Sequence, residues 1–125
     1  MSDWAVDEHK TVGGQSHFAE FVAGLTDAKD IKDAAVLISA VRALGNQLRE
    51  PRSKSLNEGL FELRRASVRI YFGFLPARRV VLLGGYVKKR SDTPPSVLRL
   101  MRARLKEAQN EDQKSRAEVT RQKGR

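Results

Sequence analysis

The chain contains no cysteine, which excludes disulfide bonds and zinc sites built on thiolates. Its two histidines, His9 and His17, are too few to hold zinc, so we expect no metal and no cofactor. The N-terminus lacks an apolar run, which argues against a secretory signal. No apolar stretch approaches the roughly 20 residues that a membrane span needs. We therefore expect a soluble, cytoplasmic protein, and its length of 125 residues predicts a single domain.

Acidic residues are scarce in the second half of the chain, and the whole chain carries a net charge of +9. Residues 1–41 hold three basic against seven acidic residues, whereas residues 42–106 hold sixteen against four, and residues 107–125 hold five against four. A positive charge concentrated in the second half predicts a local field that attracts a polyanion such as nucleic acid. The ordinary alternative is a solvated surface that only keeps the protein soluble.

Two amphipathic helices are predicted in the first half. Ser16 is a candidate N-cap for the first, whose apolar stripe is Phe18, Phe21, Val22 and Leu25. Thr26 or Asp27 can cap the second, and Gly45 stands where a helix ends. Its predicted apolar face comprises Ile31, Ala34, Ala35, Ile38, Val41 and Leu44. Stripes of this kind are almost always core, and we assign them no function.

A basic antiparallel meander is predicted from Leu60 to Lys89. Residues 4–6 can form an edge strand, and residues 48–57 are interpreted as a polar connector. Side chains then alternate between apolar and polar in residues 61–64 and 68–74, as strands do. Residues 79–89 are nearly all apolar until the terminal lysines, which is typical of a central strand.

The last predicted helix begins at a capping residue followed by Pro94 and Pro95. Its apolar seam is Leu98, Met101, Leu105 and Ala108. From Gln109 onwards the composition is almost entirely polar, so residues 109–125 are predicted to be a basic, flexible tail.

One face of the meander is apolar and must pack on the helices, which leaves a polar face. That face is predicted to present Glu62, Arg64, Arg69 and Tyr71, with Lys88 and Lys89 at the strand end. Cross-strand neighbours stand about 5 Å apart, so these side chains can converge on a phosphodiester. The equally open alternative is that both arginines pair with Glu62 on a solvated face.

An ordered set of motifs in this region resembles the phage-derived branch of the RelE/HigB toxin family. The resemblance covers roughly residues 4–108 and rests on these positions: Gly45, Pro51, Lys54, Leu56, Gly59-Leu60-Phe61-Glu62-Leu63-Arg64, Arg69-Ile70-Tyr71, Tyr86-Val87-Lys88-Lys89 and Thr93-Pro94. It implies an α+β, RelE-like fold: an N-terminal strand, a two-helix hairpin, a three-stranded antiparallel meander that completes a small sheet, and a C-terminal helix. Residues 1–108 would form the toxin domain.

The resemblance also implies a type II toxin that cuts mRNA on the ribosome, with an antitoxin partner of the helix-turn-helix class. Arg64, Arg69 and Lys89 match the positions that grip and polarise phosphate. The remaining residues assigned to RNA binding are Lys54, Glu62, Tyr71, Lys88 and Arg90. Two other functions stay open: a ParE-like inhibitor of DNA gyrase and a non-catalytic nucleic-acid binder.

The chain departs from the family at the residues that would move protons. Gly84-Gly85 stands where many relatives carry a histidine, and no C-terminal tyrosine or histidine is present near Pro95. A surrounding cluster of cations favours the neutral amine of a lysine, so Lys89 or Lys54 is the candidate general base. Tyr86 or Tyr71 could orient the nucleotide or donate a proton.

Overall fold

The computed structural model describes residues 3–89 and 93–123. Its first half comprises β1 (Ala5–Glu8), α1 (His17–Ala23), α2 (Ala28–Leu44) and the 3-10 turn η1 (Gly45–Gln47). Its second half comprises β2 (Ser53–Ser55), β3 (Phe61–Arg65), β4 (Val68–Leu75), β5 (Arg79–Val87) and α3 (Pro95–Lys123). None of the described helices combines the length and hydrophobicity needed to cross a membrane.

The strands form one five-stranded sheet in the order β1-β5-β4-β3-β2. β3, β4 and β5 are consecutive antiparallel neighbours, which confirms the predicted meander, and β1 lies parallel to β5 at one edge. The other edge strand, β2, lies inside the segment that we interpreted as a connector. Its sequence, Ser-Lys-Ser, carries no apolar alternation, and only its pairing with β3 makes it a strand.

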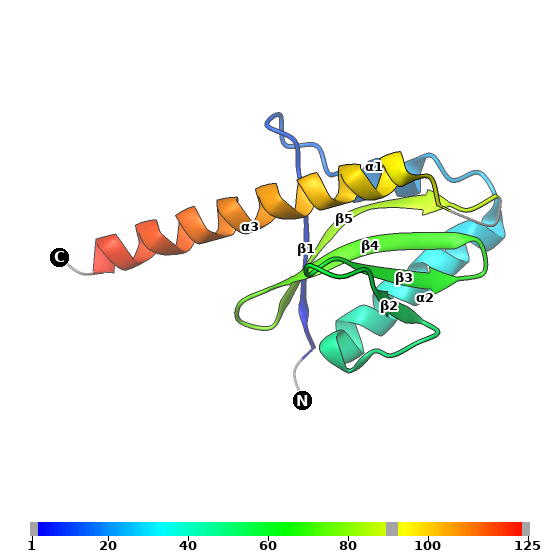
Figure 1. Cartoon of the computed structure of the whole chain (residues 1–125), viewed down its shortest axis with the longest axis horizontal. Coiled ribbons are helices and arrows are strands. Elements are labelled where there is room, and N and C mark those ends of the chain that lie inside the picture. Colours follow the sequence, from blue (N-terminus) through cyan, green and yellow to red (C-terminus); the bar gives the residue numbers. More distant parts are fainter. Residues whose placement is uncertain (1–2, 90–92, 124–125) are drawn as a thin grey trace.

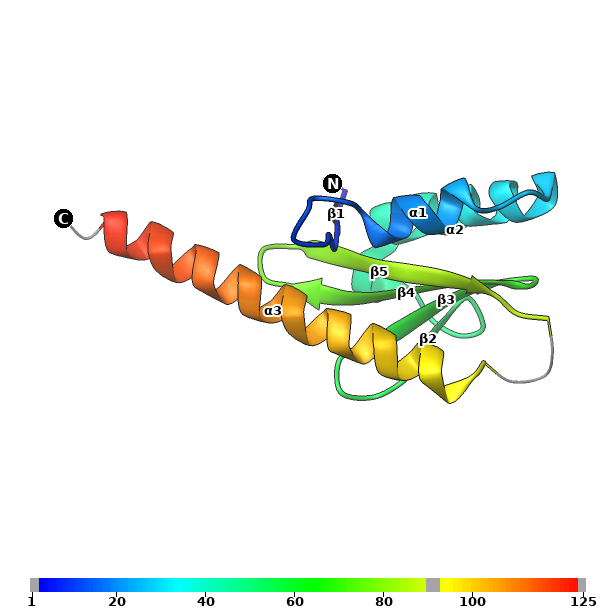
Figure 2. The same cartoon turned by 90° about the horizontal axis from the view of Figure 1, so that it is seen from above.

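Helices cover the sheet on both faces, with α1 and α2 on one side and α3 on the other (Figure 2). The predicted caps are present: the Ser16 hydroxyl accepts from the Ala19 amide, and the Asp27 carboxylate accepts from the Lys29 amide. α2 ends at Gly45, whose φ of 49° is poorly tolerated by other residues. Both helices of the sequence prediction are therefore confirmed.

The buried face of α2 differs from the predicted one. Ile31 and Leu44 are 44% and 36% exposed, whereas Leu37, which the prediction omitted, is fully buried. The helix packs on the sheet through Ala34, Leu37 and Val41. The face is narrower than the six predicted positions because the helix reaches the sheet only over its middle turns.

The sequence analysis predicted that the opposite sheet face is polar, but α3 covers part of it. α3 lies on it, and a second core forms there from Leu60, Tyr71, Leu75, Val81, Leu83, Met101, Leu105 and Ala108. The predicted apolar seam of α3 is the side that packs. A bulge assists the packing: Tyr71 pairs with Gly84 but Phe72 pairs with Leu82, so Leu83 is an extra residue that joins this core.

α3 runs to Lys123, well beyond Ala108, where we expected helix to give way to tail (Figure 1). Asp112 ties the continuation to the sheet, with Oδ1 2.6 Å from Nη2 of Arg79 on β5 and Oδ2 2.9 Å from Nε of Arg116. Beyond this anchor the helix projects past the sheet (Figures 1 and 2). Residues 109–123 are rich in residues with a high helix propensity, whereas the prediction of a flexible tail rested on their polarity alone.

Candidate nucleic-acid interface

Neighbouring strands bring most of the predicted site residues into two adjacent rows. The register aligns Lys54 with Glu62 and Tyr71 in one row, and Arg64 with Arg69 and Tyr86 in the next. Both rows belong to the sheet face that α3 covers in part. The second row lies nearer the end of the sheet where β5 finishes and where α3 begins to cross (Figure 1).

Glu62 is the buried centre of these rows, only 5% exposed. Its Oε1 lies 2.8 Å from Nε of Arg64 and 3.9 Å from Nε of Arg69. Arg69 also donates from Nη1 to the carbonyl oxygens of Ala66 and Val68, at 2.7 and 3.0 Å. The pairing that we left open as an alternative is therefore present. The pairing fixes the positions of both guanidinium groups, and it occupies the carboxylate of Glu62 with these two arginines.

A cleft of about 500 Å³ opens beside Glu62, and we call it the lysine cleft. Its lining is Lys54, Leu56, Glu62, Arg64, Lys88, Thr93, Pro95 and Leu98. Three cations thus converge from β2, β3 and the end of β5 on one depression, with the first turn of α3 as its far wall. Within the described ranges, neither Lys54 nor Lys88 has a side-chain hydrogen bond or ion pair.

Tyr71 belongs to the core and not to the surface. Its side chain is fully buried beneath α3, and its hydroxyl lies 3.5 Å from Oγ1 of Thr93. Burial raises the pKa of Tyr71 to about 12, and the negative charge of Glu62 adds to that shift. The ring has no open face on which a base could stack, so the structure removes Tyr71 from the RNA-contacting surface.

The end of β5 carries the other predicted residues. Tyr86 is half-buried and pairs with Arg69 in the strand register. Lys89 is exposed directly after the strand. Arg90 lies outside the described residues. Tyr86 is therefore the tyrosine placed beside the arginines.

Gly84 and Gly85 lie where the side chains of both flanking helices approach the sheet closely. A Cβ on Gly84, whose φ is 145°, would lie 2.7 Å from Nη1 of Arg104 and 2.9 Å from Cε of Met101. A Cβ on Gly85 would lie 2.4 Å from the ring of Phe21 on the opposite face. A side chain at either glycine would therefore require neighbouring side chains of α1 or α3 to move.

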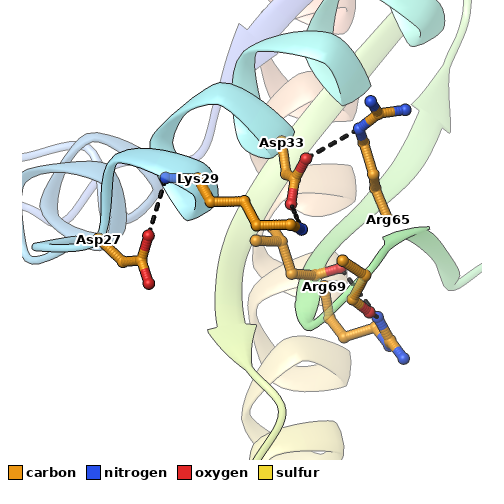
Figure 3. Close-up of polar contacts among 7 residues, drawn as sticks. Asp27, Lys29, Asp33, Arg65 and Arg69 are labelled. Carbon is orange, nitrogen blue, oxygen red and sulfur yellow. Dashed lines mark hydrogen bonds and ion pairs between the residues drawn. The ribbon is translucent and has the colours of Figure 1, made fainter.

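A second cleft, of about 560 Å³, was not predicted, and we call it the arginine cleft. It is lined by Val36, Leu37, Pro51, Arg52, Arg64, Arg65, Ala66 and Arg69. Figure 3 shows how Arg65 is held there: Asp33 of α2 lies between it and Lys29. The Asp33 oxygens are 2.9 Å from Nε of Arg65 and 2.8 Å from Nζ of Lys29.

Asp33 stays ionised because its partners are basic. The hydrogen bond from Lys29 lowers the pKa of Asp33 most, burial opposes it, and the hydrogen bond from Arg65 lowers it further. A signal for this pair was present in the sequence, since Asp33 interrupts the apolar face of α2. The partner could not be read, because Arg65 lies 32 residues away.

The histidines lie together, but not in either cationic cleft. The rings of His9 and His17 stack with centroids 5.2 Å apart, and Nε2 of His9 is 3.9 Å from Oε2 of Glu107 on α3. Burial lowers the pKa of His17, and the positive charge of Arg104 lowers it further. Neither histidine is a candidate base for chemistry at Glu62.

Residues 25–106 match the phage-derived Gp49-like protein family (DUF891). The chain belongs to this family. A solved toxin–antitoxin complex, RelBE2 from Mycobacterium tuberculosis, is similar in structure, with a TM-score of 0.43 and 20% sequence identity over 72% of this chain and 97% of that chain. No curated protein matches the chain in sequence.

The Gp49-like segment contains every described residue of both cationic clefts. It runs from two residues before the α2 cap to the middle of α3, and it leaves out β1, α1 and the projecting part of α3. The family match therefore coincides with the part of the molecule that carries the clefts. The histidine stack, built on residues 9 and 17, lies outside it.

Proposed function

We propose that the protein is the toxin of a type II toxin–antitoxin system and acts as a ribosome-dependent mRNA endoribonuclease that inhibits translation. The observation that supports this most is the lysine cleft, where Lys54, Arg64 and Lys88 converge from separate strands. Such a cluster suits a phosphodiester, because fixed cationic donors stabilise the charge that develops on phosphate oxygens. The RelE/HigB-like motifs and the Gp49-like family match include these residues.

Cleavage without a metal requires a base for the 2′-OH, stabilisation of the phosphorane, and an acid for the leaving oxygen. Arg64 and Arg69 are assigned to the phosphorane, since Glu62 fixes their orientation before substrate binds. Lys54 or Lys89 is the candidate base, and Tyr86 beside Arg69 is the candidate acid or orienting group. Lys88 completes the binding of the phosphate.

A non-catalytic nucleic-acid binder is the second candidate, and one observation favours it. In the ranges 3–89 and 93–123, neither cleft contains a histidine, and Glu62 is already engaged by Arg64. The clefts therefore bring binding groups together more clearly than proton-transfer groups.

The proposed partner is an acidic antitoxin, of the helix-turn-helix class, that covers the cationic clefts. Charge complementarity supports this choice, because segment 42–106 contributes sixteen basic and four acidic residues. Co-purification of the chain with the product of an adjacent short reading frame would test it.

The decisive experiment adds purified protein to translating ribosomes and maps the 5′ ends of the mRNA. Arg64→Ala should reduce cleavage by about 100-fold or more, the usual loss on removing one preorganised donor. Because that change also unpairs Glu62, Lys88→Ala provides a second variant that disturbs no ion pair of the described residues. Arg121→Ala, on the projecting part of α3, is the charge-matched control and should cleave normally.

Three results would contradict the proposal. Full cleavage by both Arg64→Ala and Lys88→Ala would remove the lysine cleft from the chemistry. DNA damage on expression, without new mRNA ends, would indicate a gyrase inhibitor. Salt-dependent RNA binding without cleavage would leave the non-catalytic binder.

A further inference from the structure

The arginine cleft has a lining that is partly apolar and partly cationic. Its apolar residues are Val36, Leu37, Pro51 and Ala66, from α2 and from the turns around β2 and β3. Its cationic residues are Arg52, Arg64, Arg65 and Arg69. No sequence motif pointed to Arg52 or Arg65. The cleft therefore adds cationic groups that the phosphate site in the lysine cleft does not use.

Arg52, Arg64 and Arg65 keep donors available, whereas Nη1 of Arg69 donates to two backbone carbonyl oxygens. Asp33 contacts Nε of Arg65, and Glu62 contacts Nε of Arg64, so these ion pairs use neither residue's terminal nitrogens. Figure 3 shows the terminal nitrogens of Arg65 pointing away from Asp33. The Arg52 side chain has no hydrogen-bond or ion-pair partner among residues 3–89 and 93–123.

This combination fits a nucleotide better than an isolated anion. A guanidinium offers a planar fork of donors to phosphate oxygens and can also stack on a base. The apolar lining residues next to it offer a surface against which a base can be buried away from water. Four guanidinium groups face two carboxylates, Asp33 and Glu62, so the cleft keeps a positive excess after its internal pairs are counted.

Arg64 connects the two clefts, because its side chain lines both. A single strand of RNA that places one phosphate among Lys54, Arg64 and Lys88 can continue past Arg64 towards Arg52 and Arg65. We infer that the arginine cleft is a second subsite, which binds a neighbouring nucleotide of the same single-stranded RNA through its phosphate. This inference rests on the proposed function and names the path of its substrate.

The test measures RNA binding by the full chain without ribosomes. The probes are fluorescent oligouridylates of three and nine nucleotides. The variant Arg52→Ala/Arg65→Ala removes two of the three arginines that line only the arginine cleft. The third, Arg69, is kept because the proposed function assigns it to the phosphorane. Arg42→Ala/Arg121→Ala is the control, since it removes the same charge from exposed positions outside both clefts. Circular dichroism and thermal unfolding verify that each variant is folded.

The expected result is a change in the salt dependence of binding. Each phosphate contact to a single strand contributes about 0.7 to the slope of log affinity against log salt. Losing the one phosphate contact of the second subsite should therefore make the slope shallower by about 0.7. Between 50 and 200 mM salt, the wild type should lose about 2.6-fold more affinity than the double variant. The double variant should also lose most of its preference for the longer oligonucleotide, whereas the control should keep it.

Different failures have different meanings. If ribosomal cleavage is intact and the double variant binds both probes as the wild type does, the second subsite is wrong and the proposed function stands. If the wild type neither binds nor cleaves RNA, the proposed function fails with it. Polyglutamate serves as a third probe, which stands for an acidic protein partner. If the double variant binds both oligouridylates as the wild type does but loses binding to polyglutamate, the cleft serves an acidic protein partner and the inference is overturned.

Discussion

The two ends of the sheet face beneath α3 have the same backbone architecture but differ in how far their side chains are buried. At one end, Tyr71 and Leu83 are buried against Met101 and Leu105. At the other end, the row from Arg64 to Tyr86 is only partly buried and borders the lysine cleft. The start of α3 separates them, because its first turn, at Pro95 and Leu98, forms a wall of that cleft.

This difference shows how a small domain can hold several cations close together at one end of a sheet. The covered end supplies cohesion, since apolar burial stabilises by about 25 cal/mol for each Å² removed from water. The partly open end can then keep cations close together although they repel each other. Glu62 contacts both ends. Its buried carboxylate lies close to the guanidinium groups of Arg64 and Arg69, and its backbone pairs with that of Tyr71. The following substitutions separate cohesion from binding.

The largest effect is expected from Leu105→Ala at the covered end. Leu105 is 4% exposed and packs so closely on the sheet that a Cβ on Gly73 would lie 2.4 Å from its Cδ1. Truncation of such a side chain should lower the free energy of unfolding by about 2–5 kcal/mol, measured by urea denaturation. Leu100→Ala, at a 47% exposed position on the same helix, is the control and should change it by less than about 0.5 kcal/mol. Equal losses would contradict the packing role of α3.

A smaller loss is expected from Gly84→Ala at the boundary between the ends. The new Cβ would meet Arg104 and Met101 and would occupy a backbone with φ of 145°. We expect a loss of about 1–3 kcal/mol in the free energy of unfolding. Gly14→Ala is the matched control, because its φ is 87° but nothing lies within 4 Å of the added Cβ. If both variants lose the same amount, backbone strain alone explains Gly84.

Local patterns in the sequence predicted the elements, while long-range packing decided the site. Ser16, Asp27 and Gly45 were identified as helix ends because capping chemistry is local. Alternation assigned Tyr71 and Arg69 to one sheet face, but it could not show that α3 buries the first completely and leaves the side chain of the second 12% exposed. That depends on where a helix more than twenty residues later crosses the sheet.

The arginine cleft was missed for a related reason. Arg52 and Arg65 lie 13 positions apart and meet only because β2 pairs with β3. The strand β2 itself has no apolar alternation to reveal it. Of the three cations in the lysine cleft, the strand pattern predicted Arg64 and Lys88, whereas Lys54 was identified only through the resemblance to the RelE/HigB family. The flexibility predicted for residues 109–125 stays a prediction, although the structure makes residues 109–123 helical.

A modest, pH-dependent effect is expected from Asp112→Asn, which loosens the continuation of α3. Burial alone would raise the pKa of Asp112, but the hydrogen bonds from Arg79 and Arg116 lower it below its ordinary value of 3.8. A carboxyl group with a lowered folded-state pKa stabilises the fold above its unfolded pKa and loses that contribution as the pH falls through the folded pKa. The wild type should be more stable than the variant at pH 7, by less than about 1 kcal/mol.

Thermal unfolding at pH 7 and at about pH 3 would check this dependence. The difference between wild type and Asp112→Asn should shrink as the pH falls below 3.8. Asp3→Asn, at an exposed residue near the N-terminus, is the control for the loss of one carboxylate. A difference that stays constant with pH would show that the carboxylate's charge is not what anchors the helix.

The smallest effect on stability is expected from Lys88→Ala at the open end, where binding and cohesion should separate fully. Lys88 contributes to no ion pair of the described residues, so the free energy of unfolding should change by less than about 0.5 kcal/mol. RNA affinity should nevertheless fall, and the slope of log affinity against log salt should become shallower by about 0.7. Fluorescence anisotropy with a nine-nucleotide oligouridylate measures both, and Leu105→Ala, under conditions where it is folded, should keep the wild-type slope. Loss of stability without loss of affinity would reverse the roles that we assign to the two ends.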